Sequence, residues 1–305
     1  MCKVTKIYAI INQISKFAPK YRLRMIVFTN QKELKAHLAP FINDAKTIGF
    51  VPTMGALHVG HLSLIKKSLS RNKITVVSVF VNPTQFNNPE DLEKYPRTFD
   101  ADVDKIKKLN KKVIIYAPSV EDIYEGNIVS KKFDFDGLEH QLEGKFRPGH
   151  FDGVGTIVKK LFEIVQPTYA YFGEKDYQQC LIIKKLVKKH NLPVIISVCP
   201  IMREPNGLAM SSRNERLSEE ERKQAGVIYQ TLCKAKNKLK TQSLLSVRLY
   251  VERTFKKHKQ MELEYFIVAD SKTLEPTNKY FSSKDYRAFI AVHIGGVRLI
   301  DTIPL

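Results

Sequence analysis

Two histidines three positions apart, His58 and His61, stand in the stretch VPTMGALHVGHLSLI (51–65), between an apolar run and an amphipathic helical pattern. A helix that begins directly after a strand leaves its first N–H groups unpaired and carries partial positive charge there, which favours phosphate. Gly55 and Gly60 would let a nucleotide come close to the backbone. Imidazoles at that point can donate to phosphate oxygens and stabilise charge on a transferring phosphoryl group. The stretch therefore predicts a triphosphate clamp.

A structural role, a zinc site and a Walker A loop account less well for the histidine pair. For a single histidine, a helix cap or a surface position would be the better interpretation. A zinc site would need a third ligand, and the residues around His58 and His61 include no carboxylate. A Walker A loop is excluded because no GxxxxGK[ST] pattern follows the apolar run.

Neutral amides follow two more of the apolar runs. Asn82 and Gln85 belong to NPTQF (82–86), and Gln179 ends GEKDYQQ (173–179). Amides can hold a carboxylate or a hydroxyl without the desolvation cost of a full charge. Each alone could be a loop-tip amide in solvent, but together at two strand ends they favour a shared pocket.

Two charged residues lie in the same GEKDYQQ segment. Lys175 is a point charge suited to phosphate, and Asp176 could accept from ribose hydroxyls or help to hold a metal. A solvated Lys-Asp pair at a helix start is the common alternative.

The segment MREPNGLAMSSRN (202–214) carries Gly207 and two hydroxyls beside an arginine, as a mobile loop that closes over phosphates would. A polar linker between domains would have a similar composition.

The surrounding elements must bring these segments together. Apolar runs rich in β-branched residues alternate with helical patterns, which predicts a doubly wound α/β fold with a parallel sheet covered on both faces. Such sheets bind ligands beyond the carboxyl ends of their strands, where the segments above begin. The runs expected to form strands are 47–51, 74–81, 111–118, 168–173 and 192–198.

The pattern of expected helices and strands changes near residue 200. Ser218 and Glu221 form a capping box for a helix through EEERKQAGVIYQTLCKAKNKL, and a polar stretch then leads to apolar runs at 262–270 and 287–301. We therefore expect a Rossmann-like domain over 25–199 and a small α+β domain over 200–305. Residues 1–24, with six basic and no acidic residues, read as an N-terminal extension before Met25.

Composition limits the classes of partner. The net charge is +19, but 37 of the 50 basic residues are lysines dispersed as doublets, which is typical of a solvated surface that draws in anionic substrates. We therefore expect no nucleic-acid partner. No run approaches the roughly 18 apolar residues of a membrane span, so no membrane association is expected either. Four cysteines without a CxxC pair fit a reducing cytoplasm.

The motifs, taken in order, resemble one known family. HVGH is similar to the HxGH signature of nucleotidyltransferases that attack the α-phosphate of ATP. The segments VPTMGALHVGH, VSVFVNPTQF, YPRT, RPGHFDGV, YFGEKDYQQ and GLAMSSRN occur in the order found in the pantothenate synthetase family, from about residue 25 to the C-terminus. Two departures stand out: Thr84 occupies a position that is often Met in that family, and residues 1–24 lie outside the family pattern.

The resemblance implies a two-step ligase reaction. Pantoate and ATP give pantoyl adenylate and pyrophosphate, and β-alanine then displaces AMP to give pantothenate. It implies Mg²⁺ carried on ATP, with no side-chain metal cluster and Asp176 helping indirectly, and a homodimer. It also implies site residues. The catalytic ones are His61, usually the general acid, His58, Lys175 and Arg213. The ATP-binding ones are Pro52, Met54, Gly55, His58, Gly60, His61, Gly173, Glu174, Lys175, Asp176, Met202, Met210, Ser211, Ser212 and Arg213. Those for pantoate are Asn82, Gln85 and Gln179, with Gln85 also for β-alanine.

The sequence is also compatible with two alternative functions. An adenylyltransferase that makes a dinucleotide or charges tRNA would share the HxGH loop but gives no reason for Gln85 and Gln179 to face each other. A basic nucleic-acid-binding protein would need an arginine-rich face with interleaved aromatic residues, and tight, salt-dependent binding of DNA or RNA would support it.

Overall fold

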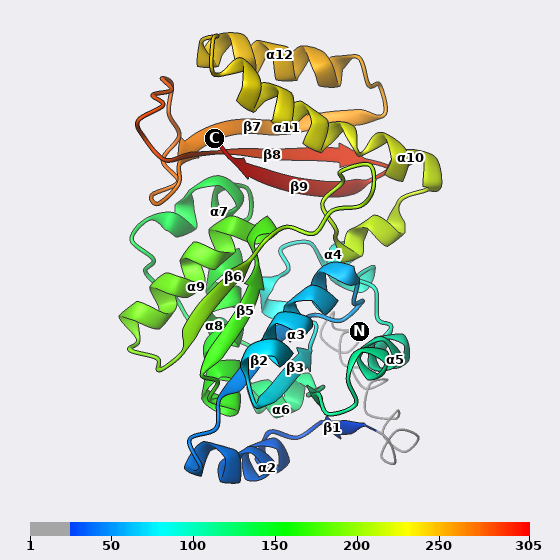
Figure 1. Cartoon of the computed structure of the whole chain (residues 1–305), viewed down its shortest axis with the longest axis vertical. Helices are drawn as coiled ribbons and strands as arrows, with labels where there is room; N and C mark the ends of the chain where they lie inside the picture. Colours follow the sequence, from blue (N-terminus) through cyan, green and yellow to red (C-terminus); the bar gives the residue numbers. More distant parts are fainter. Residues whose placement is uncertain (1–24) are drawn as a thin grey trace, which may run out of the picture.

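A six-stranded parallel sheet forms the first part of the molecule (Figure 1). The structure is a computed structural model that describes residues 25–305, so the expected extension over 1–24 lies outside the described residues. The strand order is β1-β4-β3-β2-β5-β6, and every pair is parallel. The strands are β1 (Ile26–Phe28), β2 (Ile48–Thr53), β3 (Ile74–Val79), β4 (Ile114–Tyr116), β5 (Tyr169–Gly173) and β6 (Ile195–Cys199).

Successive strand residues enter different cores, as the apolar runs require. In β2, Phe50 joins the core under α2 (Gln31–Asn43), α8 (His150–Val165) and α9 (Tyr177–Lys189). Its neighbour Val51 joins a second core under α3 (Val59–Arg71) and α5 (Phe99–Leu109). Helices therefore cover both faces of the sheet, and the predicted doubly wound α/β fold is confirmed.

Short helical turns fill the connections at the carboxyl ends of the strands and beside α8. They are η2 (Pro83–Gln85), α4 (Pro89–Glu93), α6 (Val120–Tyr124), η3 (Leu138–His140), α7 (Leu142–Phe146), η4 (Glu174–Asp176) and η5 (Ser212–Arg216).

Among residues 25–305, no helix is both long and apolar enough to cross a bilayer.

A three-stranded antiparallel sheet, in the order β7-β8-β9, forms the C-terminal part. Gly295 and Gly296 join β8 to β9 with φ of 55° and 69°, as a two-residue hairpin with left-handed backbone requires. The helices α11 and α12 cover the face of this sheet that points away from the first sheet (Figure 1). The elements are α10 (Glu219–Gln224), α11 (Val227–Lys238), α12 (Leu244–Lys256), β7 (Met261–Asp270), β8 (Tyr286–Ile294) and β9 (Val297–Pro304).

One expectation for this part of the chain was wrong. The capping box of Ser218 and Glu221 is present, but the helix it starts ends at Gln224 and a new one begins at Val227. Asn206 packs at the break: its side-chain amide donates to two carbonyls at the end of α10, and an added Cβ on Gly226 would lie 2.8 Å from the Asn206 backbone oxygen. The stretch that reads as polar also contains α12.

The first core continues into the second sheet. Tyr265, Phe289 and Ala291 of β7 and β8 belong to the same buried cluster as α8 and α9. Arg298 on β9 pairs with Glu143 on α7 at 2.6 Å, so charged contacts accompany the apolar ones. The division into domains at residue 199 stays a prediction, and the two sheets share a continuous interface.

Candidate active site

A cavity of about 240 Å³ lies beyond the carboxyl ends of β2, β3 and β5, where the segment after β6 covers it. Of the predicted site residues, Gly55 and Glu174 do not line it: Gly55 sits behind the turn with φ +82°, and Glu174 pairs with Arg287 at 2.9 Å. The predicted residues that line it are Pro52, Met54, His58, Gly60, His61, Asn82, Gln85, Gly173, Lys175, Asp176, Gln179, Met202, Met210, Ser211, Ser212 and Arg213.

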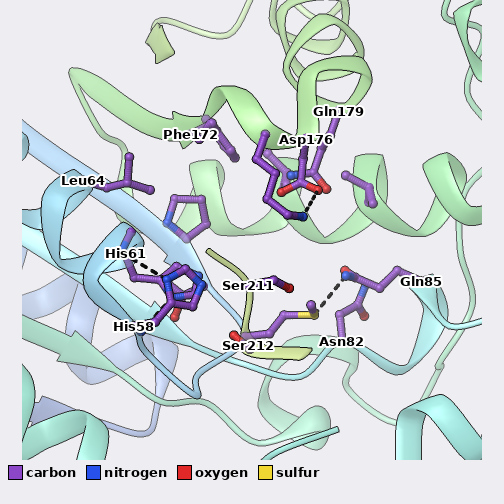
Figure 2. A pocket seen from close by; sticks show the side chains of 18 of the residues that line it. His58, His61, Leu64, Asn82, Gln85, Phe172, Asp176, Gln179, Ser211 and Ser212 are labelled. Atoms are coloured by element: carbon purple, nitrogen blue, oxygen red, sulfur yellow. Dashed lines mark hydrogen bonds and ion pairs between the residues drawn. The ribbon is translucent and has the colours of Figure 1, made fainter. Parts of the chain in front are cut away.

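The two histidines lie at the start of helix α3, where their side chains accept hydrogen bonds from backbone N–H groups of the first turn (Figure 2). His58 is the N-cap, and its Nδ1 accepts the N–H of Gly60 at 3.1 Å. The Nδ1 of His61 accepts the N–H of His58 at 3.4 Å. A ring nitrogen that accepts carries no proton, so each neutral imidazole holds its proton on Nε2. Two Nε2–H donors are therefore available beside the start of the helix.

Both imidazoles are neutral at pH 7 in this structure. Burial, aided by the charge of Lys175, lowers the pKa of His58 to about 4. Burial and then the neighbouring His58 lower the pKa of His61 well below its ordinary value. The pair therefore acts on an incoming anion as hydrogen-bond donors, and a bound polyphosphate would raise both pKa values.

A buried carboxylate holds the turn that leads into this helix. Ala56 has a left-handed φ of 49°, an uncommon backbone for a residue with a Cβ. Asp102, fully buried on α5, accepts the N–H of Ala56 at 2.8 Å and that of Leu57 at 2.7 Å. Lys105, one turn further along α5, donates to the Leu57 carbonyl at 2.6 Å. Sequence reasoning missed Asp102, although an acid four residues before the buried Ile106 was a usable signal.

The amides at the other side of the cavity form a network. Asn82 is 1% exposed, and its Nδ2 donates to Gln85 Oε1 and to the Gly153 carbonyl, each at 3.2 Å. Its Oδ1 accepts from the Tyr124 hydroxyl at 2.5 Å. Gln85 Nε2 lies 3.0 Å from the sulfur of Met54 (Figure 2). Asn82 thus orients Gln85, whose amide faces the cavity.

Thr84, one of the two departures from the family pattern, belongs to the same network. Its hydroxyl lies 3.2 Å from Asn82 Oδ1 and 3.0 Å from the hydroxyl of Tyr124. Helix α8 passes close behind, since a Cβ on Gly153 would lie 2.3 Å from the Thr84 carbonyl oxygen. Thr84 therefore adds a polar contact to the support of the amides.

Two further residues that the site prediction left out support Gln85 from α8 and the loop before it. His150 Nδ1 lies 2.8 Å from the Gln85 carbonyl oxygen, so this nitrogen donates. The Nη2 atom of Arg147 donates to the same carbonyl at 3.3 Å. Its Nη1 atom donates to His150 Nε2, also at 3.3 Å. Burial, then the charge of Arg147, lowers the pKa of His150 to about 4. Both belong to the RPGHF segment of the sequence, to which the residue pattern gave no role.

The segment over the cavity is held at two points. Ser212 donates to the Ala56 carbonyl at 3.0 Å, which joins this segment to the histidine turn. Arg213 pairs with Asp91 of helix α4 at 2.7 Å, and Arg216 reaches the same carboxylate at 3.2 Å. The guanidinium of Arg213 is thus engaged by a carboxylate while it lines the cavity.

The cavity suits a metal that arrives on phosphate. Within residues 25–305, no group of three or more His, Cys, Asp or Glu side chains could hold a metal ion. Asp176 is the one acidic residue in the described wall, where it lies 3.4 Å from Lys175. Magnesium prefers oxygen ligands and is commonly held by one or two carboxylates together with substrate phosphates, which fits this wall.

Known proteins share this arrangement over nearly the whole chain. The family model described as pantoate-beta-alanine ligase matches residues 26–304. The chain is 61% identical to the pantothenate synthetase of Flavobacterium psychrophilum, covering 92% of this chain and all of that protein. It resembles the crystal structure of pantothenate synthetase from Thermus thermophilus with a TM-score of 0.83 and 37% identity, over 92% of this chain and 99% of that one.

A third similar structure carries ligands. It is the pantoate-beta-alanine ligase of Francisella tularensis complexed with beta-gamma ATP and beta-alanine. That protein is 39% identical to this chain, with a TM-score of 0.76, over 92% of this chain and 97% of its own.

Proposed function

Because this chain belongs to the pantoate-beta-alanine ligase family and therefore condenses pantoate with β-alanine using ATP, we propose that it does so through a pantoyl adenylate. The observation that carries this proposal is that donors suited to phosphate and amides suited to a carboxylate line the same cavity. His58 and His61 stand on one side of it, and Gln85 on the other (Figure 2).

In the first step, a carboxylate oxygen of pantoate attacks the α-phosphorus of ATP. The bond from that phosphorus to the bridging oxygen breaks, and pyrophosphate leaves with the electron pair. Gln85 and Gln179 hold pantoate, while the Nε2–H groups of His58 and His61, with Lys175, stabilise the phosphate charge. Catalysis then consists of positioning and electrostatic stabilisation, without a side-chain nucleophile.

In the second step, the amine nitrogen of β-alanine attacks the carbonyl carbon of the adenylate. The C–N bond forms, the bond from that carbon to the phosphate oxygen breaks, AMP leaves, and the nitrogen loses its protons to water. The segment carrying Ser211, Ser212 and Arg213 covers the cavity and keeps the adenylate from water.

Magnesium would be held by ATP phosphates, with Asp176 as the protein carboxylate beside it. When bound, it neutralises charge on the phosphates and so assists the departure of pyrophosphate.

We also propose a homodimeric assembly and a reducing compartment. The similar family is usually dimeric through its first domain, so we expect a sedimentation mass of twice 35.0 kDa, and a single-chain mass would contradict it. Cys180, Cys199 and Cys233 are free thiols, which fits a reducing compartment such as the cytoplasm.

Release of pyrophosphate tests the mechanism. With ATP, Mg²⁺ and pantoate alone, the enzyme should release pyrophosphate, and AMP and pantothenate should appear only after β-alanine is added. If a folded, ATP-binding enzyme releases no pyrophosphate with pantoate, the adenylate mechanism is wrong and another second substrate must be sought.

A further inference from the structure

Three cations line the cavity, and they differ in their partners. Lys175 lies 3.4 Å from Asp176, and Arg213 lies 2.7 Å from Asp91. Arg147 has no carboxylate within 4.0 Å among residues 25–305, and its hydrogen-bond partners are the neutral His150 ring and the Gln85 carbonyl.

The acid nearest to Arg147 in sequence is already engaged. Glu143, one turn earlier, accepts two hydrogen bonds from Arg298 at 2.6 and 2.8 Å and one from the Tyr265 hydroxyl at 2.6 Å. Burial lowers the pKa of Arg147, which reflects a cation removed from water without a paired anion. Such a charge is costly to bury unless a ligand compensates it.

Arg147 has donors to spare. Its guanidinium carries five N–H groups, of which one points to His150 and one to the Gln85 carbonyl. The side chain also lines a smaller cavity of about 50 Å³ that continues from the main one towards the second sheet. The fork is therefore free to bind a carboxylate with two parallel hydrogen bonds.

The position of Arg147 indicates which anionic group of the substrates its guanidinium binds. Arg147 contacts the Gln85 backbone, and Gln85 lies across the cavity from His58 and His61 (Figure 2). The phosphates are expected at the histidines, and the pantoate carboxylate is consumed in the adenylate. One anionic group of the reaction then has no partner: the carboxylate of β-alanine, two methylenes away from its reacting amine.

We propose that Arg147 binds the β-alanine carboxylate and so selects an amine that bears an acid at its far end. This inference rests on the proposed function. His150 fixes the guanidinium by accepting from Nη1, so the fork is oriented before the substrate arrives.

The test compares β-alanine with its neutral analogue β-alaninamide in wild type, Arg147→Gln, Arg147→Lys and the matched control Lys145→Gln, an exposed lysine two residues away. Arg147→Gln should raise the KM for β-alanine about tenfold or more, as expected for loss of a charged hydrogen bond. It should also abolish most of the preference for β-alanine over β-alaninamide. Arg147→Lys should keep part of that preference, and Lys145→Gln should keep all of it.

Pantoate-dependent exchange of pyrophosphate into ATP separates this inference from the mechanism. Exchange should persist in Arg147→Gln, and the KM for pantoate should rise far less than the KM for β-alanine, because the first step involves no β-alanine and Arg147 supports the pantoate site only through the Gln85 carbonyl. A pantoate KM raised as much as the β-alanine KM would mean that Arg147 acts only by holding Gln85. An unchanged preference for β-alanine over β-alaninamide would exclude carboxylate binding. Either result overturns the inference. Absence of exchange in wild type would overturn the adenylate, while the β-alaninamide comparison would still decide the role of Arg147.

Discussion

The protons of His58 and His61 are placed by the backbone, since each Nδ1 accepts an N–H from the start of α3. Each ring can then present only Nε2–H to the cavity while it stays neutral. An amide side chain can copy one nitrogen of a histidine at a time: the oxygen of Asn replaces Nδ1, and the terminal nitrogen of Gln replaces Nε2. This provides a direct test of which nitrogen matters.

We expect His61→Asn to lower kcat by about 100-fold, the usual cost of one lost donor to a developing oxyanion. His61→Gln retains a distal N–H and should be clearly more active than His61→Asn. Steady-state kinetics of both variants, with unfolding midpoints near wild type, check this. Turnover at the wild-type rate in His61→Asn would remove the Nε2–H from the mechanism.

His150 should make the stability of the protein sensitive to acid. Its pKa is about 4 when folded and about 6.5 when unfolded, so between these values the unfolded chain binds more protons. The free energy of unfolding should therefore fall as the pH drops from about 6.5 to 4, and this contribution should be constant above that window. Urea titrations at several pH values should give a shallower decline for His150→Asn than for wild type.

The matched control for this titration is His140→Asn, because the His140 side chain is 80% exposed. It should follow the wild-type decline. If the free energy of unfolding declines in parallel for His150→Asn and wild type, then His150 is not the group whose protonation destabilises the fold in acid.

At the scale of elements, helix α5 determines the shape of the turn before α3. Asp102→Asn leaves one acceptor for two backbone donors and places an NH₂ group against the second, which should cost about 1–3 kcal/mol of stability. The KM for ATP should rise and the KM for pantoate should not, as pyrophosphate exchange can measure. Asp100→Asn, exposed on the same helix, is the control. Unchanged ATP kinetics in a less stable Asp102→Asn would make Asp102 merely structural.

The elements that could be predicted from sequence are those with local causes. Strands buried on both faces must be apolar throughout, so β2, β3 and β5 were readable, and the histidine pair lies within one turn of a helix. The residues that escaped prediction act on distant segments. Asp102 bonds a residue 46 positions away, Asp91 bonds one 122 positions away, and Asn206 from another loop contacts the break at Gly226.

At the scale of the whole molecule, the two sheets should unfold together. A single buried cluster joins α8 and α9 to β7 and β8, and Arg298 ties β9 to Glu143. Urea unfolding followed by far-UV circular dichroism and by tyrosine fluorescence, usable because the chain has no tryptophan, should give coincident single transitions. Two separated transitions would show that the interface is weaker than its contacts indicate.

The pairing of Arg213 with Asp91 makes ATP binding a competition. If the arginine must leave this carboxylate before it can meet a phosphate, the apparent affinity equals the intrinsic affinity multiplied by the fraction of molecules in which it is released. A pair formed nine-tenths of the time would weaken binding about tenfold, and Asp91→Asn would restore that factor in a measured Kd. The affinity of the enzyme for ATP would then be set partly by a residue on helix α4 that does not line the cavity, and substitutions there could adjust the enzyme to the ATP level of its cell.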